Sequence, residues 1–242
     1  MIVRDHPNSH IVKEIRRKPV AIIPVGSTEQ HGPHLPVSTD SDIISFIAEK
    51  VSEKTGFLLL PTIEYGVSFE HHPFFNLSVK PGTLQKYLIE ICASLWKNKI
   101  KTIIILNGHH GNQKALKEVP SKVARIHGIR PKILVYSYWH FMKQRFDHAG
   151  FVETSIMRAI SGHVEMSKAE KGLVEDGLSK KEIYRLGKAA NKSFIAVTRN
   201  GVWGDPTRAT AKEGRKILGE IIASIVKDSQ TCLTGESRKL HQ

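Results

Sequence analysis

A short stretch, residues 26–40, holds residue types that bind divalent metal ions. Glu29 and His31 are two positions apart, so in an extended segment their side chains point to the same face. Asp40 follows a rigid turn rich in glycine and proline and can return to the same point. Carboxylate plus imidazole is the ligand mix that Zn²⁺ or Mn²⁺ accepts. The alternative is a polar surface loop in which Asp40 or Ser41 caps the next helix.

Two further polar clusters contain the same residue types. Residues 107–112 include His109 and His110, and a third cluster includes His148 and Glu153, five positions apart. The three clusters together supply enough oxygen and nitrogen ligands for two divalent ions, with one carboxylate bridging them. Such ions hold a bridging hydroxide at neutral pH and polarise a carbonyl, while a nearby His or Glu moves a proton to the leaving nitrogen. The expected chemistry is amide hydrolysis without a covalent intermediate.

A serine or cysteine nucleophile is poorly supported. No Gly-x-Ser-x-Gly elbow occurs in the sequence. Cys92 and Cys232 are far apart and lie in apolar, helix-like patterns, so they form neither a disulfide framework nor a metal site. Because the N-terminal residues lack the pattern of a signal peptide, we expect a cytoplasmic protein with reduced thiols.

The polar clusters follow apolar runs that predict buried strands. Residues 19–25 precede the first cluster, and residues 102–106, β-branched and uninterrupted, precede the second. Helical patterns separate the strands, which favours a mostly parallel sheet whose carboxyl edge carries the clusters. Further strands are expected at 57–61, 132–136 and 194–197, and helices at 42–54, 83–98, 113–127 with an interruption at Pro120, after Gly150, and from 211 to about 227.

Length and composition predict one soluble α/β domain. The 242 residues, 40% of them apolar, suffice for a sizeable core. We expect a single domain over residues 1–242, with three α/β/α layers, a mostly parallel central sheet and a polar tail from about residue 228. Residues 168–187 read as a surface excursion, and Asp205 as a helix cap followed by Pro206.

The chain is strongly basic, with a net charge of +13. The Lys and Arg residues are scattered, mostly on predicted helix faces, without dense runs or interleaved aromatic residues, so a nucleic-acid partner is not expected. A basic field would help to draw in an anionic substrate. No apolar run approaches the roughly 18 residues that a membrane span needs. A rival interpretation is a catalytically idle protein that binds a nucleotide or RNA through its basic surface.

Four motifs resemble the creatininase (creatinine amidohydrolase) family. They are GSTEQHGPHLP at 26–36, NGHHGN at 107–112, HAGFVETS at 148–155 and GVWGDP at 201–206, in the family's order and spread over most of the chain. The resemblance implies an α/β fold with a mainly parallel sheet, a homo-oligomer that is commonly a hexamer, and two divalent metal ions, Zn or Mn, with Fe as a further candidate. The implied substrate is a small-molecule amide.

The resemblance also implies roles for individual residues. Glu29 and His31 would each bind a different metal, Asp40 would bridge both, and His109 would be a ligand. His148 matches the family's catalytic histidine, which donates a proton to the leaving nitrogen. The residues expected to contact the substrate are Ser68, His71, Gly108, His110, Tyr138 and Trp139, although Tyr138 and Trp139 could equally be core aromatics, and His34 could be a ligand or a loop-stabilising residue.

One position departs from creatininase itself, which has a glutamate ligand two residues after the histidine that matches His109. Here that position is Gly111, and Glu153 is the expected replacement, as a ligand and a catalytic carboxylate. The departure weakens creatinine as the substrate. The family also includes a deformylase that acts on a formylaminopyrimidine ribosyl phosphate and a peptidase that trims a redox-cofactor precursor peptide. The chemistry that these enzymes share is hydrolysis of a non-standard C–N amide bond, and a phosphorylated substrate would suit the basic surface.

Overall fold

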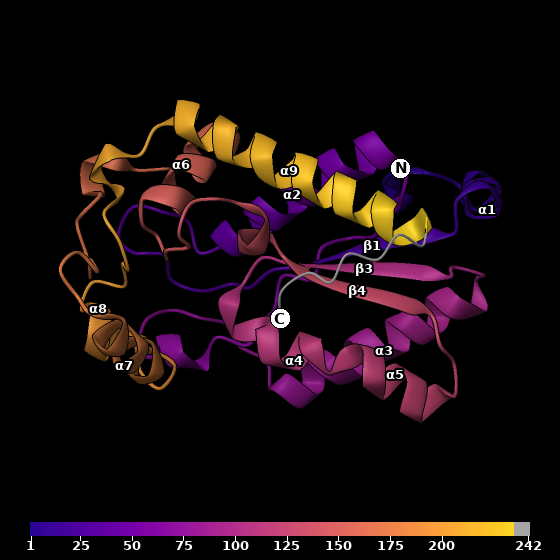
Figure 1. The fold of residues 1–242 in the computed structure, drawn as a ribbon, viewed down its shortest axis with the longest axis horizontal. Coiled ribbons are helices and arrows are strands. Elements are labelled where there is room, and N and C mark those ends of the chain that lie inside the picture. Colours follow the sequence, from indigo (N-terminus) through magenta and orange to yellow (C-terminus); the bar gives the residue numbers. More distant parts are fainter. Residues whose placement is uncertain (235–242) are drawn as a thin grey trace.

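A sheet of four parallel strands forms the centre of the computed structural model, which describes residues 1–234. The strands lie in the order β2-β1-β3-β4 (Figure 1), and their bounds are β1 Val20–Val25, β2 Leu58–Leu59, β3 Thr102–Asn107 and β4 Lys132–Ser137. Val25 lies opposite Asn107, which lies opposite Ser137, so β1, β3 and β4 end in register. The loops that follow these three strands therefore leave the sheet at the same edge.

Helices cover both faces of the sheet. Alternate residues of β1 point to opposite faces: Ile22 packs in one hydrophobic cluster and Ile23 in the other. The first cluster is closed by α2 Thr39–Thr55, α6 Phe151–Ile160 and α9 Ala211–Thr234. The second is closed by α3 Pro81–Lys97, α4 Gln113–Lys117 and α5 Val119–His127. The predicted three-layer α/β/α fold is confirmed.

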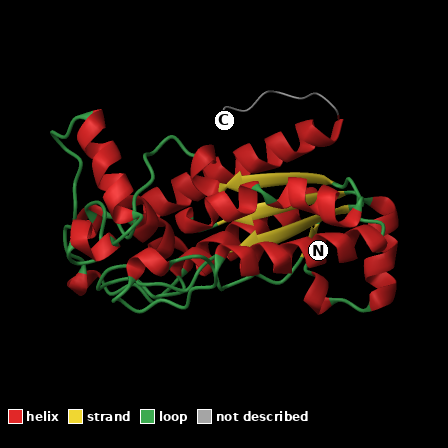
Figure 2. Ribbon diagram, turned by 90° about the horizontal axis from the view of Figure 1, so that it is seen from below, coloured by secondary structure: helices red, strands yellow, loops and turns green. Residues whose placement is uncertain are grey.

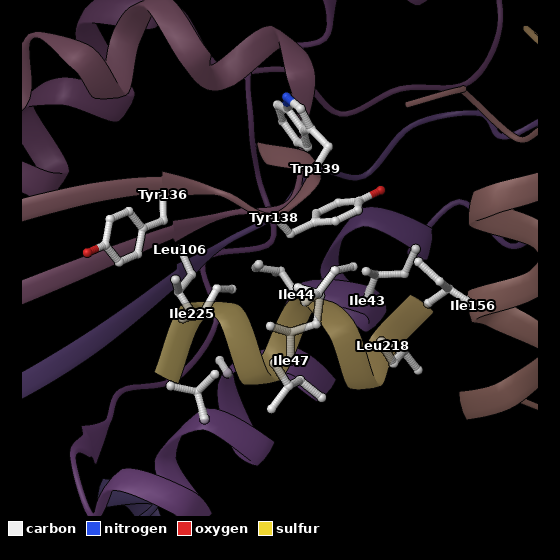
Figure 3. Packing of buried hydrophobic residues seen from close by; sticks show 14 of the residues in the cluster. Ile43, Ile44, Ile47, Leu106, Tyr136, Tyr138, Trp139, Ile156, Leu218 and Ile225 are labelled. Atoms are coloured by element: carbon white, nitrogen blue, oxygen red, sulfur yellow. The ribbon is translucent and has the colours of Figure 1, made fainter. Parts of the chain in front are cut away.

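The layer formed by α2 and α9 fixes the start of α2, where Asp40 lies. Ile43, Ile44 and Ile47 of α2 are fully buried and meet Leu218 and Ile225 of α9 (Figure 3). Burying one such side chain stabilises the fold by about 1.5–3 kcal/mol. The first turn of α2 is therefore anchored by packing that does not involve its polar residues.

The remaining helices lie outside these layers. α1 Asn8–Arg17 precedes β1. α7 Lys180–Ala190 and α8 Phe194–Thr198 lie together beyond the carboxyl ends of the strands, at the end of the molecule toward which the strand arrows point (Figures 1 and 2). The expected surface excursion therefore contains a helix that stands over the strand ends.

Two predictions of secondary structure are wrong. Residues 194–197 form α8 instead of a strand: Thr198 donates its hydroxyl to the carbonyl of Phe194 at 2.8 Å, and the Phe194 ring packs 4.6 Å from the ring of His71. The segment lies over the strand ends and pairs with no edge of the sheet. The expected polar tail from residue 228 is also wrong up to Thr234, because α9 continues to that residue and Asp228 accepts a hydrogen bond from Tyr136 at 2.5 Å. The rest of the expected tail, 235–242, lies outside the described residues.

The interruption expected at Pro120 is confirmed. α4 ends at Lys117 and α5 begins at Val119, which places Pro120 in the first turn of α5, where its missing N–H has no helical partner to lose. Among the described residues, no helix is both long enough and apolar enough to cross a membrane.

Candidate metal centre

The five predicted ligands come from four parts of the fold and meet in one buried cluster. Glu29 and His31 lie in the loop after β1, Asp40 in the first turn of α2, His109 directly after β3 and Glu153 in the first turn of α6. All five side chains are buried. The two oxygens of Asp40 face different histidines: Oδ1 lies 3.2 Å from His31 Nε2, and Oδ2 lies 3.0 Å from His109 Nδ1.

Each half of the cluster contains a second carboxylate. Glu29 Oε1 lies 3.2 Å from His109 Nδ1, whereas Glu153 Oε2 lies 3.7 Å from His31 Nε2. The cluster thus consists of Glu29 with His109 and of Glu153 with His31, and Asp40 lies between them. This is the grouping that a two-ion site with a bridging carboxylate requires.

The outer nitrogens of both histidines contact backbone carbonyls. His31 Nδ1 lies 3.0 Å from the carbonyl of Glu29, and His109 Nε2 lies 2.8 Å from the carbonyl of Val67. Because a carbonyl only accepts, the N–H of each neutral ring is on this outer nitrogen. The inner nitrogen then points a lone pair at the carboxylates, which is how metal-binding histidines are oriented in proteins.

Several inner atoms of the cluster make close ionic contacts but no well-aligned hydrogen bond. Glu29 Oε1, His31 Nε2 and Asp40 Oδ2 are all buried in this way, and ligand atoms of these three residues lie within 4.8 Å of one another. A buried polar atom without a partner destabilises a fold by about 1–3 kcal/mol. Oxygen and imidazole nitrogen are donors that Zn²⁺ and Mn²⁺ accept, so the residues fit divalent ions.

Burial and neighbouring charges raise the pKa of some groups in the cluster and lower that of others. Burial raises the pKa of Glu29 to about 7 and that of Glu153 to about 8. Burial alone would lower the pKa of His31, but the charges of Asp40, Glu153 and Glu29 outweigh it and raise the pKa to about 10. Burial would raise the pKa of Asp40, yet His31 and His109 hold it below its usual range.

Metal loading is therefore expected to release protons. At pH 7.5 the metal-free protein carries a proton on His31, and a metal ion binds only the neutral ring. Apparent affinity should rise with pH until His31, whose pKa is about 10, has lost its proton; burial would lower the pKa of His109, but Glu29 and Asp40 raise it well above its ordinary value, so this ring must lose a proton as well. Calorimetry of Zn²⁺ binding in two buffers of different ionisation enthalpy measures the released protons. Heats that are independent of the buffer would contradict this prediction.

Glycines permit the close approach of the loops that carry the ligands. A Cβ on Gly108 would lie 2.6 Å from the carbonyl oxygen of Asp40, so the chain after β3 passes directly against the start of α2. A Cβ on Gly111 would lie 2.2 Å from the carbonyl of Val67 and 2.8 Å from Glu70 Oε1. No side chain fits at Gly111, and Glu153 is the further carboxylate that contacts the His31 half of the cluster.

Hydrogen bonds at the start of α6 hold Glu153. Its Oε2 accepts from the amide of Ala149 at 2.7 Å, and its Oε1 accepts from Tyr138 at 3.2 Å. Asp147 caps the same turn by accepting from the amides of Val152 at 2.8 Å and Glu153 at 3.3 Å. These contacts fix the carboxylate from behind and leave Oε2 facing His31.

His148 lies beside the cluster. Its Nδ1 is 4.0 Å from Glu29 Oε1, and its ring centroid is 4.3 Å from that of His31. A pair of backbone hydrogen bonds with Trp203, at 3.1 and 2.8 Å, holds the segment in place. Burial, and then the charge of His31, lowers the pKa of His148 well below its ordinary value. A neutral imidazole at this position can accept a proton and pass it on.

Gln30, between two predicted ligands, was not singled out by sequence reasoning. Its amide oxygen accepts from the Gly32 amide at 2.9 Å, and its amide nitrogen donates to the Gly201 carbonyl at 3.3 Å. The same nitrogen lies 2.9 Å from His71 Nδ1 and 3.1 Å from His148 Nε2. The N–H of neutral His71 is then on Nε2, 3.2 Å from Glu29 Oε1.

Replacing Gln30 with Met should lower kcat by about 10- to 100-fold, because the His71 ring loses the contact that orients it and His148 Nε2 keeps only the Gln30 backbone carbonyl, at 3.1 Å. Metal content should not change, since Gln30 points away from the ligand atoms. Steady-state kinetics together with metal analysis measure both effects. The same substitution at Gln85, a buried glutamine on α3, is the control and should leave kcat unchanged. Loss of metal from the Gln30 variant would contradict a role limited to orientation.

The cluster opens into a cavity of about 390 Å³. Of the residues predicted to contact substrate, His71 and His110 line it. Its outer wall comes from later parts of the chain, including Phe146, α7, Phe194 and Trp203. Sequence reasoning missed these residues, and the charged, loosely patterned segment that contains α7 offered no signal of a site.

The other four predicted substrate contacts lie outside the cavity lining. Gly108 packs against the backbone of Asp40, and Ser68 is fully buried with an unpaired hydroxyl. Tyr138 is buried behind Glu153, and the ring of Trp139 stacks on Phe146 at 4.6 Å. Both aromatics are core residues, as the alternative interpretation held, and His34 points away from the cluster to the Thr154 hydroxyl at 2.8 Å.

A parallel α/β fold with a buried carboxylate–histidine centre at the carboxyl edge of its sheet defines the class of a metal-dependent hydrolase. The family model described as creatininase, creatinine amidohydrolase, matches residues 7–228. The solved structure of creatininase with Mn has a TM-score of 0.80 and 22% identity, covering 93% of this chain and 96% of that one. A creatininase mutant of Zn–Zn type has the same TM-score, 0.80, and 22% identity, covering 93% and 95%.

Two relatives of known activity are similar over most of their length. A mycofactocin precursor peptide peptidase from Mycobacterium ulcerans (strain Agy99) is 33% identical over 221 residues, 86% of this chain and 83% of that protein. A 2-amino-5-formylamino-6-ribosylaminopyrimidin-4(3H)-one 5'-monophosphate deformylase from Methanocaldococcus infernus is 28% identical over 214 residues, 86% and 90% respectively. The chain belongs to the creatininase family, and the expectation of a metal-dependent hydrolase of C–N amide bonds is confirmed.

Proposed function

We propose that this chain hydrolyses the C–N bond of a small-molecule amide, cyclic or formyl, with two divalent ions bound by Glu29, His31, Asp40, His109 and Glu153. The observation that carries the proposal is the orientation of His31 and His109. Each directs its outer nitrogen to a backbone carbonyl and its inner nitrogen to one oxygen of Asp40. Creatininase structures of Zn–Zn type and with Mn support these two metals, and Fe is a further candidate.

Divalent ions at such a site supply Lewis-acid polarisation of a carbonyl and a nucleophilic water at neutral pH. The residues around them position the substrate and move the proton. His148, neutral and 4.0 Å from Glu29, is the group that delivers a proton to the leaving nitrogen. Glu153 acts both as a ligand and as a catalytic carboxylate. His71 contacts Glu29 Oε1 at 3.2 Å and fixes that side of the site.

The substrate is an amide that fits a cavity of about 390 Å³. The relatives support two classes: a formamide on a phosphorylated pyrimidine ribosyl compound, and an amide bond in a peptide. The net charge of +13 favours an anionic compound, such as a phosphorylated one. Creatinine is disfavoured, because Gly111 stands where creatininase has a glutamate ligand.

A panel of amides tests the proposal. Metal-reconstituted protein is assayed with creatinine, the formylaminopyrimidine ribosyl phosphate, cyclic and formyl amides, and short peptides, with the Glu29→Gln variant as control. Metal-dependent hydrolysis of one compound, lost in the variant, supports the proposal. If the protein takes up no metal on reconstitution and hydrolyses none of the compounds, the result would instead support an idle protein that binds a nucleotide or RNA.

We further propose that residues 1–242 form one amidohydrolase domain that assembles as a cytoplasmic homo-oligomer. A hexamer is the size that the family resemblance favours. Light scattering of the purified protein measures the assembly, and a monomer would contradict it.

A further inference from the structure

Helix α7 forms the outer wall of the cavity. The side chains of Tyr184, Lys188 and Asn191 line it, together with the backbone at Gly187. These positions are spaced by three and four residues, so they form one stripe along the helix. Ser179 begins the helix with a capping box to Glu182, so the stripe is presented by a regular helix.

Both acidic and basic side chains line the cavity. Its inner end is the proposed metal centre, with Glu29 and Asp40, and the carboxylates of Glu70, Asp147 and Glu175 line the cavity as well. The cations that line it are Arg145, which pairs with Glu175, and Lys188. Within residues 1–234, Lys188 has no carboxylate partner, and its ammonium lies 4.8 Å above the centre of the Tyr184 ring. Its positive charge is therefore available to a ligand.

The whole of α7 adds to this charge. The helix contains Lys180, Lys181, Arg185 and Lys188 against one acidic residue, Glu182. In the described part of the chain none of these four forms an ion pair, and Glu182 is engaged by Ser179 at the helix start. An uncompensated basic helix at the cavity wall attracts an anionic group to its own side of the cavity.

We propose that Lys188, with Tyr184 and Asn191, binds an anionic group of the substrate, a phosphate or a carboxylate, while the scissile amide lies at the inner end. Lys188 supplies a point charge of the kind that binds phosphate and carboxylate oxygens, and the Asn191 amide can donate a hydrogen bond. The ring of Tyr184, which is 63% exposed, offers a surface for a planar part of the substrate. This inference rests on the proposed function and adds the substrate's charge and its orientation.

Matched substrate pairs test the inference. The first pair is the formylaminopyrimidine ribosyl phosphate and its dephosphorylated nucleoside, and the second is a short peptide with a free C-terminal carboxylate and the same peptide amidated. The chain is compared with Lys188→Ala, Lys188→Arg and Arg185→Ala. Arg185 lies on the same helix and does not line the cavity, so its variant removes the same charge from another face.

The expected result is a preference in kcat/KM for the anionic member of one pair, which Lys188→Ala reduces by about tenfold through KM. Lys188→Arg should keep most of the preference, and Arg185→Ala should keep nearly all of it. The pair that shows the effect distinguishes phosphate from carboxylate. An unchanged preference in Lys188→Ala, or an equal loss in both alanine variants, would overturn the inference.

Equilibrium binding separates this inference from the proposed function. The four compounds are titrated into metal-free protein, in which the anionic group has no metal ion to bind. Tighter binding of the anionic member that depends on Lys188 supports the subsite even if no compound is hydrolysed. Hydrolysis of both members of a pair at equal rates, with equal binding, would support the proposed function and overturn the subsite.

Discussion

Replacing Asp40 with Ala is expected to remove the bound metal and to lower kcat by a factor of about 10³ or more. Asp40 contacts both histidine halves of the cluster, at 3.2 and 3.0 Å, so it is the residue whose loss affects both ion sites at once. The catalysis that divalent ions provide in such enzymes amounts to several kcal/mol, and a loss of about 4 kcal/mol corresponds to this factor. Metal analysis and steady-state kinetics on the same preparation measure the two effects.

The matched control for this experiment is Asp42→Ala. Asp42 lies in the same helical turn and accepts a hydrogen bond from Ser38 at 2.8 Å, away from the cluster. It should keep its metal and most of its activity. If Asp40→Ala retained two ions, or hydrolysed the substrate at the unmodified rate, the bridging role proposed for Asp40 would be wrong.

The ligand positions could be predicted because they depend on local rules. Buried β-branched runs predict β1 and β3, and the residues that follow parallel strands gather at one edge of the sheet. Asp40 returns to Glu29 and His31 because α2 begins one residue before it, at Thr39. The glycine at position 108 allows His109 to approach this helix start. Sequence spacing therefore carried most of the information about the cluster.

The cavity walls could not be predicted because they depend on packing between distant segments. Gln30 meets His148 across 118 positions of sequence, and Lys188 reaches the site from a helix whose pattern resembles any solvated helix. Phe194 was expected in a strand, yet it lies in a short helix above His71. None of these contacts follows from periodicity or from local turn chemistry.

The two aromatic residues after β4 were predicted to contact substrate but do not line the cavity. Tyr138 and Trp139 directly follow a strand, at the edge of the sheet where substrate contacts are expected. The 3₁₀ turn Tyr138–Phe141 sends the Tyr138 side chain toward Ile43 and Ile44 of the core, with the Trp139 ring on the other side of the turn (Figure 3). The Tyr138 hydroxyl still reaches Glu153 at 3.2 Å, so it supports a proposed ligand and does not line the cavity.

Replacing His148 with Ala is expected to lower kcat by about 10²- to 10⁴-fold while both ions stay bound. The imidazole is the proposed proton donor to the leaving nitrogen, and a positioned acid or base contributes about this factor. Its Nδ1 is 4.0 Å from Glu29, farther than the 3.0–3.2 Å that separates His109 from its carboxylates, so the metal ligands keep their geometry. The control is His163→Ala, an exposed histidine just after α6, which should leave kcat unchanged.

The pH dependence of kcat separates proton transfer from a structural role of His148. Burial and the charge of His31 lower the pKa of His148 well below 6.5, so the ring is neutral at and above that pH and becomes charged only in more acidic solution. Any decline in rate caused by its protonation therefore lies well below pH 6.5, and the Ala variant should lose that acidic limb along with its activity. Loss of metal from His148→Ala would make His148 a ligand, and an acidic limb that the variant retained would assign the proton transfer to another group, such as Glu153.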